Sequence, residues 1–342
     1  MDGSGPEAET VISSRVRIAR NIRGIPFPYL ASDAQTRHVQ EIVAGVAASQ
    51  KKAFQKCAFI PMENLVSLEK ELLVEKHLVS PFLARDSQHG ALLLRQDEAV
   101  SIMINEEDHL RIQVILPGLQ LEEALEEADR YDDFLEAEIN YAYDENYGYL
   151  TACPTNVGTG LRASVMLHLP ALIMTGQANR LLGALSQVGL AVRGLYGEGT
   201  EIIGNLVQIS NQITLGQSEE EIIRNLDGVT RQVIEQEQAA RQALLNKNRA
   251  QIGDRSWRSL GQLKFAQLMS SQEAMQLLSD VRLGYDLGLL KGITRKLLNE
   301  MMVVNSPACL QILAEKELTP AERDLERPVQ LKKIMEQFKE SG

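Results

Sequence analysis

The stretch from residue 91 to residue 116, ALLLRQDEAVSIMINEEDHLRIQVIL, predicts the fold class of this chain. It contains three runs rich in leucine, isoleucine, valine and methionine, at residues 91–95, 100–105 and 110–116. The polar segments between these runs are short, as in strands joined by hairpins. Parallel strands need a crossover connection of a dozen or more residues. The stretch therefore predicts an antiparallel sheet.

Hydrophobic periodicity predicts the remaining elements on both sides of this stretch. Helices are expected at residues 35–50, 63–77 and 119–137. Further strands are expected at residues 147–153, 163–169, 190–195 and 206–211. A long helix is expected to begin at Ser218, where Glu221 completes a capping box.

From about Leu245 onward the pattern is helical, with breaks expected at residues 253–254, Gly292 and residues 306–307. The chain of 342 residues is long for one compact domain, so two domains are expected. The prediction is an α+β fold with an antiparallel sheet flanked by helices at residues 1–244. A helical domain at residues 245–342 is expected to follow it.

Composition excludes several classes of protein. Hydrophobic residues make up 44% and charged residues 24% of the chain, which is typical of a soluble globular protein and excludes a disordered one. The longest apolar stretch, residues 164–176, is interrupted and shorter than the roughly 18 residues of a membrane span. The first ten residues are polar and acidic, so no signal peptide is expected. Three widely spaced cysteines fit neither a disulfide framework nor a zinc pattern, which favours a reducing cytoplasm.

Charge is distributed unevenly along the chain. The formal net charge is -11, and the acidic residues are concentrated before residue 239. The densest acidic segment, residues 121–145, contains a single base, Arg130. Such a field repels nucleic acid and attracts basic partners. The segment is interpreted either as a solvated helix face or as a guide for cationic substrates.

Five arginines stand beside distinctive turns or glycine-rich segments. Two of them, Arg15 and Arg17, are two residues apart in SSRVR, so an extended segment places both on one face. The others are Arg111 after NEEDHL, Arg162 after CPTNVGTGL, and Arg193 before GLYGE. Guanidinium groups suit phosphate oxygens and stay charged at any relevant pH, so the set indicates an anion site. Surface salt bridges are the alternative for any single arginine. The chain has neither a Walker phosphate loop nor a protein-kinase HRD or DFG motif.

Four blocks of sequence resemble the signature blocks of the phosphagen (guanidino) kinases, the family of creatine and arginine kinase. They are residues 11–28, 105–111, 153–162 and 193–198. The resemblance implies an antiparallel sheet flanked by helices and ATP–Mg phosphoryl transfer to a guanidinium nitrogen. It implies that the five arginines bind the nucleotide phosphates and that His77 packs on the adenine. The nucleotide-binding residues carried over from the family are Ser13, Ser14, Arg15, Val16, Arg17, His77, Arg111, Arg162, Ala163, Ser164, Val165, Met166, Arg193, Gly194, Leu195, Tyr196, Gly197 and Glu198.

Two departures from that family resemble the bacterial protein arginine kinases of the McsB type. The helical substrate-selecting domain that precedes the SSRVR block in phosphagen kinases is expected to be absent, and about a hundred residues follow the long helix. The segment RDLER, residues 323–327, resembles the RDxxR motif that binds phosphoarginine away from the active site. The resemblance therefore implies an allosteric site at Arg323, Asp324 and Arg327. Taken without the family, the segment is a charged, exposed helix start.

The chemistry of the guanidinium indicates which residues act on it. A guanidinium is a poor nucleophile, because its lone pairs are delocalised and it is protonated at neutral pH. Two carboxylates can grip the planar group in line with the γ-phosphate, and one can accept its proton. Glu107 and Glu198 occupy the two family positions for this role. Cys153 matches the family cysteine beside the guanidinium, which is expected to position the substrate; the alternative is a small buried thiol.

Three hypotheses follow from these residues: a protein arginine kinase, a kinase for free arginine or another small guanidine, and a non-catalytic adaptor that recognises phosphoarginine. The first is preferred, with Mg²⁺ held mainly by the nucleotide phosphates and water. The resemblance implies a homodimer through the C-terminal helices and a zinc-finger activator protein. It implies heat-shock repressors and misfolded proteins as substrates and delivery of marked proteins to a Clp-type protease. Direct binding to nucleic acid or membrane is not expected.

Overall fold

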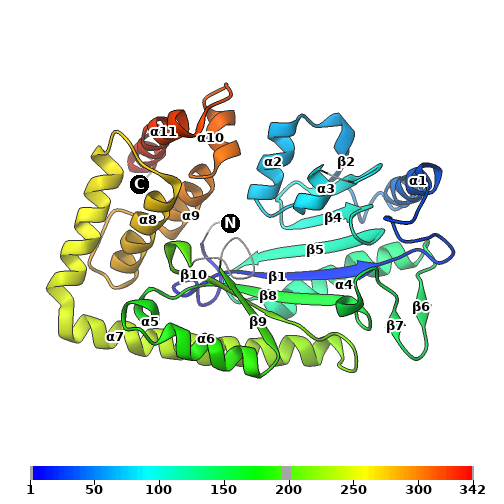
Figure 1. Ribbon diagram of the computed structural model, residues 1–342, viewed down its shortest axis with the longest axis horizontal. Coiled ribbons are helices and arrows are strands. Elements are labelled where there is room, and N and C mark those ends of the chain that lie inside the picture. Colours follow the sequence, from blue (N-terminus) through cyan, green and yellow to red (C-terminus); the bar gives the residue numbers. More distant parts are fainter. Residues whose placement is uncertain (1–2, 86, 195–201, 341–342) are drawn as a thin grey trace.

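The computed structural model describes residues 3–85, 87–194 and 202–340 (Figure 1). These residues form one antiparallel sheet of eight strands. In sheet order the strands are β2 (Cys57–Pro61), β3 (Ala91–Arg95), β4 (Val100–Ile104), β5 (Leu110–Pro117), β1 (Val11–Arg20), β8 (Leu161–His168), β10 (Leu206–Asn211) and β9 (Leu190–Gly194). Strands β3, β4 and β5 are successive hairpin partners, so the antiparallel sheet predicted from residues 91–116 is confirmed.

One face of the sheet is apolar and is covered by helices α1 (Asp33–Ser49), α4 (Leu121–Glu136) and the first half of α7 (Glu219–Phe265). Ile18, Ile112 and Val165 on this face are fully buried. The helices contribute stripes of valine, alanine, leucine and isoleucine to the same core. Because side chains alternate along a strand, the opposite face carries the other half of the residues, and many of these are polar.

Helix α7 leaves the sheet and continues into the C-terminal region (Figure 1). Its second half packs with α8 (Ser271–Asp286), α9 (Arg295–Val304), α10 (Pro307–Leu313) and α11 (Pro320–Glu340) around a second apolar core. The boundary drawn at residues 244 and 245 lies inside α7, close to Asn248, whose backbone (φ -133°) kinks the helix. The break predicted at residues 253–254 is wrong, because α7 continues through these residues to Phe265. The breaks at Gly292 and Pro307 are confirmed.

Other predicted elements changed in the structure. The helix expected at residues 63–77 is a 3₁₀ turn at Met62–Asn64 followed by α2 (Ser67–Glu75), and α3 (Pro81–Arg85) comes next. The strand expected at residues 147–153 shrinks to β7 (Gly148–Tyr149), which pairs only with β6 (Tyr143–Asp144). Short helices α5 (Pro170–Met174) and α6 (Ala178–Gln187) precede β9. The capping box at Ser218 is confirmed, since the Ser218 and Glu221 side chains each bond the other's backbone N–H at 3.2 and 2.9 Å.

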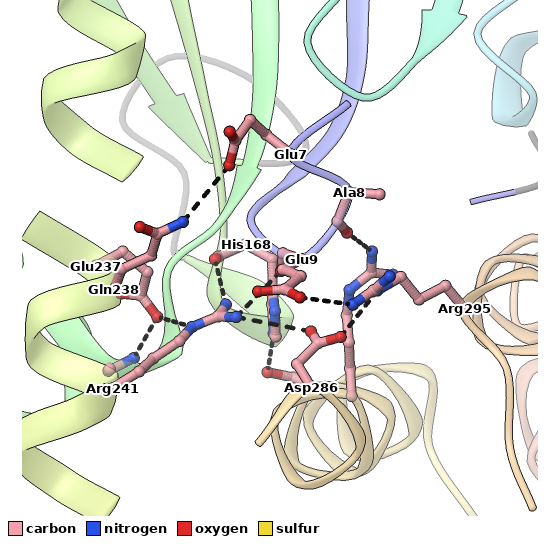
Figure 2. A network of polar contacts seen from close by, with 12 residues as sticks. Glu7, Ala8, Glu9, His168, Glu237, Gln238, Arg241, Asp286 and Arg295 are labelled. Carbon is pink, nitrogen blue, oxygen red and sulfur yellow. Dashed lines mark hydrogen bonds and ion pairs between the residues drawn. The ribbon is translucent and has the colours of Figure 1, made fainter. Parts of the chain in front are cut away.

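A buried polar network joins the sheet to the C-terminal helices (Figure 2). The Glu237 carboxylate on α7 accepts the backbone N–H groups of Ala171 and Leu172 at 3.0 and 2.9 Å. Arg241 donates from Nε to the Glu237 carboxylate at 2.7 Å and from Nη2 to the His168 carbonyl at 3.2 Å. Glu237 is fully buried, so its charge depends on these partners. The network thereby fixes the end of β8, the start of α5 and α7 relative to one another.

The segment before β1 lies against the same network. Arg241 Nη1 donates to the Glu9 carbonyl at 3.2 Å, and Arg282 Nη2 on α8 donates to the Ala8 carbonyl at 3.0 Å. Arg295 on α9 pairs with Asp286 at 2.9 Å and with the Glu9 carboxylate at 3.3 Å. The C-terminal helices therefore hold the chain that enters β1, the strand that carries Arg15 and Arg17. None of the helices in the described ranges is both long enough and apolar enough to cross a membrane.

Candidate active site

The strand registers bring the predicted arginines together on the face of the sheet opposite the one that α1, α4 and the first half of α7 cover. In an antiparallel pair, residues directly opposite each other share a face. Arg17 on β1 lies opposite Arg162 on β8, and Arg15, two residues earlier, points to the same side. Arg111 on β5 lies opposite Ala19, which also shares the face of Arg17. Four of the five arginines therefore line three adjacent strands.

The fifth arginine reaches the same face through two further strands. Arg193 on β9 lies opposite Gln208 on β10, Gln208 lies opposite Met166 on β8, and Met166 lies opposite Ser13 on β1. Ser13 precedes Arg15 by two residues, so all these side chains belong to one face. The sequence indicated an anion site from separate turns, and the registers supply the single surface that such a site needs.

The electrostatics of this face match an anion site. Burial and, after it, the charges of Arg162, Arg111 and Arg193 together lower the pKa of Arg15 to about 10. The pKa of Arg17 is lowered well below its usual value, first by burial and then by Arg15, Arg111 and Arg162. Positive charges that repel each other in a partly buried site are stabilised when an anion binds.

The contacts of the β1 arginines are consistent with such a site. Arg15 donates from Nε to Ser164 Oγ at 3.3 Å and from Nη2 to Gln208 Oε1 at 3.0 Å. Both acceptors are neutral, so they orient the guanidinium without cancelling its charge. Arg17 Nε is buried and has no hydrogen-bond partner within the described part of the chain. A buried donor of this kind is satisfied when an acceptor such as a phosphate oxygen binds.

The turn between β4 and β5 places Glu107 at the edge of this face. Arg111 donates from Nη2 to Glu107 Oε2 at 3.0 Å and pairs through Nη1 with Glu106 Oε2 at 2.8 Å. Glu106 is 3% exposed, whereas the Glu107 side chain is 46% exposed. Glu106 therefore neutralises Arg111 from within the protein, and Glu107 is left accessible. Of these two carboxylates, Glu107 is the one placed to meet a substrate.

A buried aspartate ties this turn to the loop that carries Cys153. Asp108 is fully buried, and its Oδ1 accepts the Asn21 side-chain amide and the backbone N–H of Ala152, each at 2.6 Å. Burial raises the pKa of Asp108, and these two bonds act in the opposite direction. Glu107 precedes Asp108, and Cys153 follows Ala152. The hydrogen bond between Asp108 and Ala152 therefore brings Glu107 and Cys153 close together. The half-buried Cys153 thiol lies 3.0 Å from Thr155 Oγ1.

His77 lies beside the β1 arginines, as the predicted adenine contact requires. Its carbonyl accepts the Gln113 side-chain amide at 2.8 Å, and Gln113 is directly opposite Arg17. The pKa of His77 is lowered to about 4 by the protein that surrounds the ring and by repulsion from Arg15 and Arg17. The ring is therefore neutral at neutral pH, a state suited to packing against an aromatic base.

The remaining predicted nucleotide-binding residues divide into three groups. Ser13, Ser164 and Met166 lie on the arginine face. The side chains of Ser14, Val16, Ala163 and Val165 are buried on the helix-covered face, so only their backbone is available to a ligand. Gly194 is the last residue of β9. Leu195, Tyr196, Gly197 and the predicted catalytic Glu198 lie outside the described residues.

The structure adds residues that the sequence reasoning missed. They are Asn21, Glu106, Asp108, Gln113 and Gln208. The three consecutive acids 106–108 were visible in the sequence, but their separate roles were not, because burial decides which carboxylate is structural. Gln113 and Gln208 are polar residues in otherwise apolar strands, and that position was the available signal.

The predicted phosphoarginine site has one inward-facing member. Arg327 is 2% exposed, and it donates from Nη1 to the Met269 carbonyl and to Asp324 Oδ1, each at 2.6 Å. Its Nε donates to the Asn305 carbonyl at 3.3 Å. Arg323 and Asp324 remain partly exposed. The prediction of an exposed helix start holds in part for Arg323 and Asp324, but it is wrong for Arg327. The buried Arg327 side chain binds α11 to the segments before α8 and after α9.

Comparison with known proteins places the chain in a family. The model of the ATP:guanido phosphotransferase C-terminal catalytic domain matches residues 38–240, and that of the protein-arginine kinase McsB C-terminal domain matches residues 249–342. A protein named protein-arginine kinase from Brevibacillus brevis is 55% identical over 96% of this chain and 92% of its own length. One from Moorella thermoacetica is 54% identical over 98% and 96%. The chain belongs to the protein-arginine kinase family.

Solved structures agree with this placement in the protein-arginine kinase family. Lombricine kinase shares 27% identity and a TM-score of 0.62, over 71% of this chain and 70% of its own. A taurocyamine kinase from Schistosoma mansoni with bound transition-state-analogue components has the same fold, at 24% identity and a TM-score of 0.61, over 69% of this chain and 34% of its own. The resemblance to guanidino kinases and the predicted fold class are thereby confirmed.

Proposed function

We propose that this protein transfers the γ-phosphoryl group of ATP to the guanidinium of arginine residues in proteins. The observation that carries the proposal is the gathering of five arginines on one sheet face, with the exposed Glu107 at its edge. Family membership supports it, because the matching relatives are named protein-arginine kinases. The site combines an anion-binding surface with a carboxylate suited to a guanidinium.

In this proposal the residues of the chain divide the work. Arg15, Arg17, Arg111, Arg162 and Arg193 bind the nucleotide phosphates and offset charge on the transferring group. His77 packs on the adenine. Glu107 and Glu198 grip the guanidinium and hold one nitrogen in line, and one of them accepts its proton. Cys153 positions the substrate beside them. Mg²⁺ is held mainly by phosphate oxygens and water, and it neutralises charge on the phosphates.

The proposal is tested by incubating the protein with ATP, Mg²⁺ and a basic protein such as a histone, followed by mass spectrometry under conditions that preserve the acid-labile P–N bond. Phosphoarginine on the basic protein is expected. Phosphate found only on serine, threonine or tyrosine would contradict the proposal, as would ATP turnover that leaves the protein unmodified.

A kinase for small guanidines is the second candidate, because the similar solved structures include lombricine and taurocyamine kinases. A parallel assay with free arginine distinguishes the two, since a protein kinase is expected to prefer the chain-borne residue. A non-catalytic adaptor that recognises phosphoarginine is the third hypothesis. The presence of Glu107 beside a complete arginine set weighs against it.

We propose the finer organisation from family resemblance. Residues 1–244 act as the catalytic unit and residues 245–342 as a unit for dimerisation and phosphoarginine binding. Exposed apolar residues on the C-terminal helices and on the connection between α7 and α8 support a homodimer contact there: Trp257, Phe265, Leu268, Leu325 and Val329. The proposed partners are a zinc-finger activator, heat-shock repressors and misfolded proteins as substrates, and a Clp-type protease, all in the cytoplasm.

The proposed regulatory site predicts different results for two neighbouring residues. Asp324→Asn is expected to abolish activation by added phosphoarginine, because the partly exposed side chain loses its negative charge and one of the two acceptor oxygens that a guanidinium needs.

Arg327→Ala is expected to lower the free energy of unfolding by about 1–3 kcal/mol, since two buried carbonyls lose their donor. Progress curves with and without phosphoarginine test the first effect, and urea denaturation tests the second. An unchanged response in Asp324→Asn would contradict the regulatory site.

A further inference from the structure

A cavity of about 670 Å³ lies on the helix side of the sheet, apart from the arginine face. Its walls come from α4, from the β6–β7 ribbon (lower right in Figure 1) and from the chain that leads into α7. The acidic run that stood out in the sequence, residues 121–145, supplies much of this wall. The proposed phosphoryl transfer does not use this cavity.

The cavity carries a large excess of negative charge. Five carboxylates line it: Asp129, Asp132, Asp133, Glu136 and Glu219. The single cation among the lining residues is Arg20, which is 2% exposed. Arg20 is already committed, since it pairs with Asp132 at 2.6 Å and donates to the Thr159 carbonyl at 2.8 Å. Among the described residues, the other four carboxylates have no cation paired with them except Arg20, which approaches Glu219 at 3.7 Å.

One of the lining carboxylates has an unused oxygen. Asp132 is 6% exposed, and its Oδ2 is bonded to Arg20, but its Oδ1 lacks a hydrogen-bond partner in the part of the chain that the structure describes. The buried Tyr141 hydroxyl interacts with this carboxylate through its charge and through a side-chain hydrogen bond, which after burial both raise the pKa of Tyr141, but within the described residues that contact lies outside normal hydrogen-bond geometry. A buried carboxylate oxygen that is left unpaired is satisfied when a cationic donor binds.

Burial, and after it the proximity of these acids to one another, makes their negative charge costly. Burial raises the pKa of Asp129 to about 6, and Asp132 beside it acts in the same direction. Burial likewise raises the pKa of Glu219 to about 7 against the opposing effect of Arg20, and Asp129 adds to the rise. A bound cation relieves this repulsion.

Tyrosines at the rim suit one kind of cation in particular. Tyr143 and Tyr147 are 48% and 58% exposed, and both line the cavity. The guanidinium carbon of Arg20 lies 3.5 Å from the centre of the Tyr149 ring, so this site already stacks one guanidinium on an aromatic face. A planar guanidinium can stack on a ring and bond carboxylates in its own plane at the same time, which an ammonium cannot do.

The cavity and the proposed transfer site share one loop. Tyr149 and Gly158, which line the cavity, are paired by a β-bridge at the base of this loop. Between them the chain passes Ala152, whose N–H is bound to Asp108 in the turn of Glu107, and Cys153. A substrate chain that places one arginine at Cys153 and Glu107 therefore runs close to the cavity.

We propose that this cavity binds the guanidinium of a second arginine of the protein substrate, and that this contact selects segments in which arginines lie near one another. The inference rests on the proposed function, because it assumes that the first arginine occupies the transfer site. The second arginine adds binding energy without touching the reacting atoms, so it lowers KM and leaves kcat nearly unchanged.

The experiment compares peptides that carry one acceptor arginine and a second residue at successive positions on either side of it. The second residue is arginine, lysine or citrulline, the neutral analogue of arginine. Phosphorylation of the acceptor alone is measured by tandem mass spectrometry. At the best spacing, arginine is expected to lower KM about 10-fold relative to citrulline, with lysine clearly weaker.

Matched variants locate the effect. Asp133→Asn with Glu136→Gln neutralises two exposed cavity carboxylates, and it is expected to remove the preference for the second arginine. Glu123→Gln with Glu126→Gln removes the same charge from exposed positions of α4 outside the cavity, and it is expected to retain the preference. The citrulline peptide should be phosphorylated at a similar rate by both variants.

Several results would overturn the inference. Equal KM values for the arginine and citrulline peptides would contradict it, as would equal KM values for the arginine and lysine peptides. An equal loss of preference in both double variants would also contradict it, because that result would show only a diffuse acidic field. The failure of the proposed function has a separate signature. In that case no peptide is phosphorylated on arginine, whatever its second residue.

Discussion

Replacing Glu107 by glutamine is expected to lower turnover by at least about 10²-fold while ATP still binds. The substitution keeps the size of the side chain but removes its negative charge and its ability to accept a proton. Glu106 continues to neutralise Arg111, so the phosphate-binding face should keep its arrangement. The expected signature is a low kcat with an ATP affinity near that of the unmodified protein. Phosphoarginine formation and isothermal titration with ATP measure the two quantities.

A control shows that the effect belongs to the site. Glu63→Gln makes the same chemical change at an exposed position of the 3₁₀ turn Met62–Asn64, and it is expected to leave turnover unchanged. Glu198→Gln should behave like Glu107→Gln, because the two carboxylates are proposed to grip one guanidinium. Near-normal turnover in Glu107→Gln would contradict the assignment of Glu107 as the group that orients the guanidinium or accepts its proton.

Replacing Arg17 by methionine is expected to stabilise the unliganded protein and to lower kcat/KM for ATP by about 10²–10³-fold. The depressed pKa of Arg17 means that its positive charge is disfavoured in the fold, beside Arg15, Arg111 and Arg162. Methionine keeps the apolar stem and removes this repulsion. The same change removes a charged donor from the phosphates, so function should fall as stability rises.

Arg20→Met provides the matched comparison, because Arg20 lies on the same strand but on the other face. Its pKa is raised, since burial, which disfavours its charge, is outweighed by Asp132 and further partners. Removal of Arg20 leaves the buried Asp132 without its cation, and a loss of about 3–5 kcal/mol in unfolding free energy is expected. Thermal melts with and without ATP test both variants. A lower melting temperature for unliganded Arg17→Met would contradict the proposed strain of the arginine face.

The sequence alone determined the features that depend on neighbouring residues. Short hairpin connections around residues 91–116 required antiparallel pairing, and the period of two placed Arg15 and Arg17 on one side of their strand. The capping box at Ser218 set the start of α7 because both partners lie within one turn. These are local properties, and local geometry is encoded by spacing.

Family resemblance supplied the functional interpretation of residues that local geometry could not connect. The spacing of Arg17, Arg162 and Arg193 does not predict that they lie on one surface, because long stretches of chain separate them. Their meeting depends on registers that are fixed when the apolar halves of several strands are buried together. The sequence could name these residues, and only the folded sheet could assemble them.

Tertiary structure also decided which charges are structural and which are free. Glu106 and Glu107 are adjacent and chemically alike, yet one is buried against Arg111 and the other is accessible. The sequence predicted Arg327 in an exposed helix start, but neighbouring segments bury its side chain beneath α11. The acidic run of α4 becomes one wall of a cavity because the β6–β7 ribbon and the start of α7 close around it. Burial and charge pairing arise from contacts between distant segments, and the spacing of residues along a chain does not contain them.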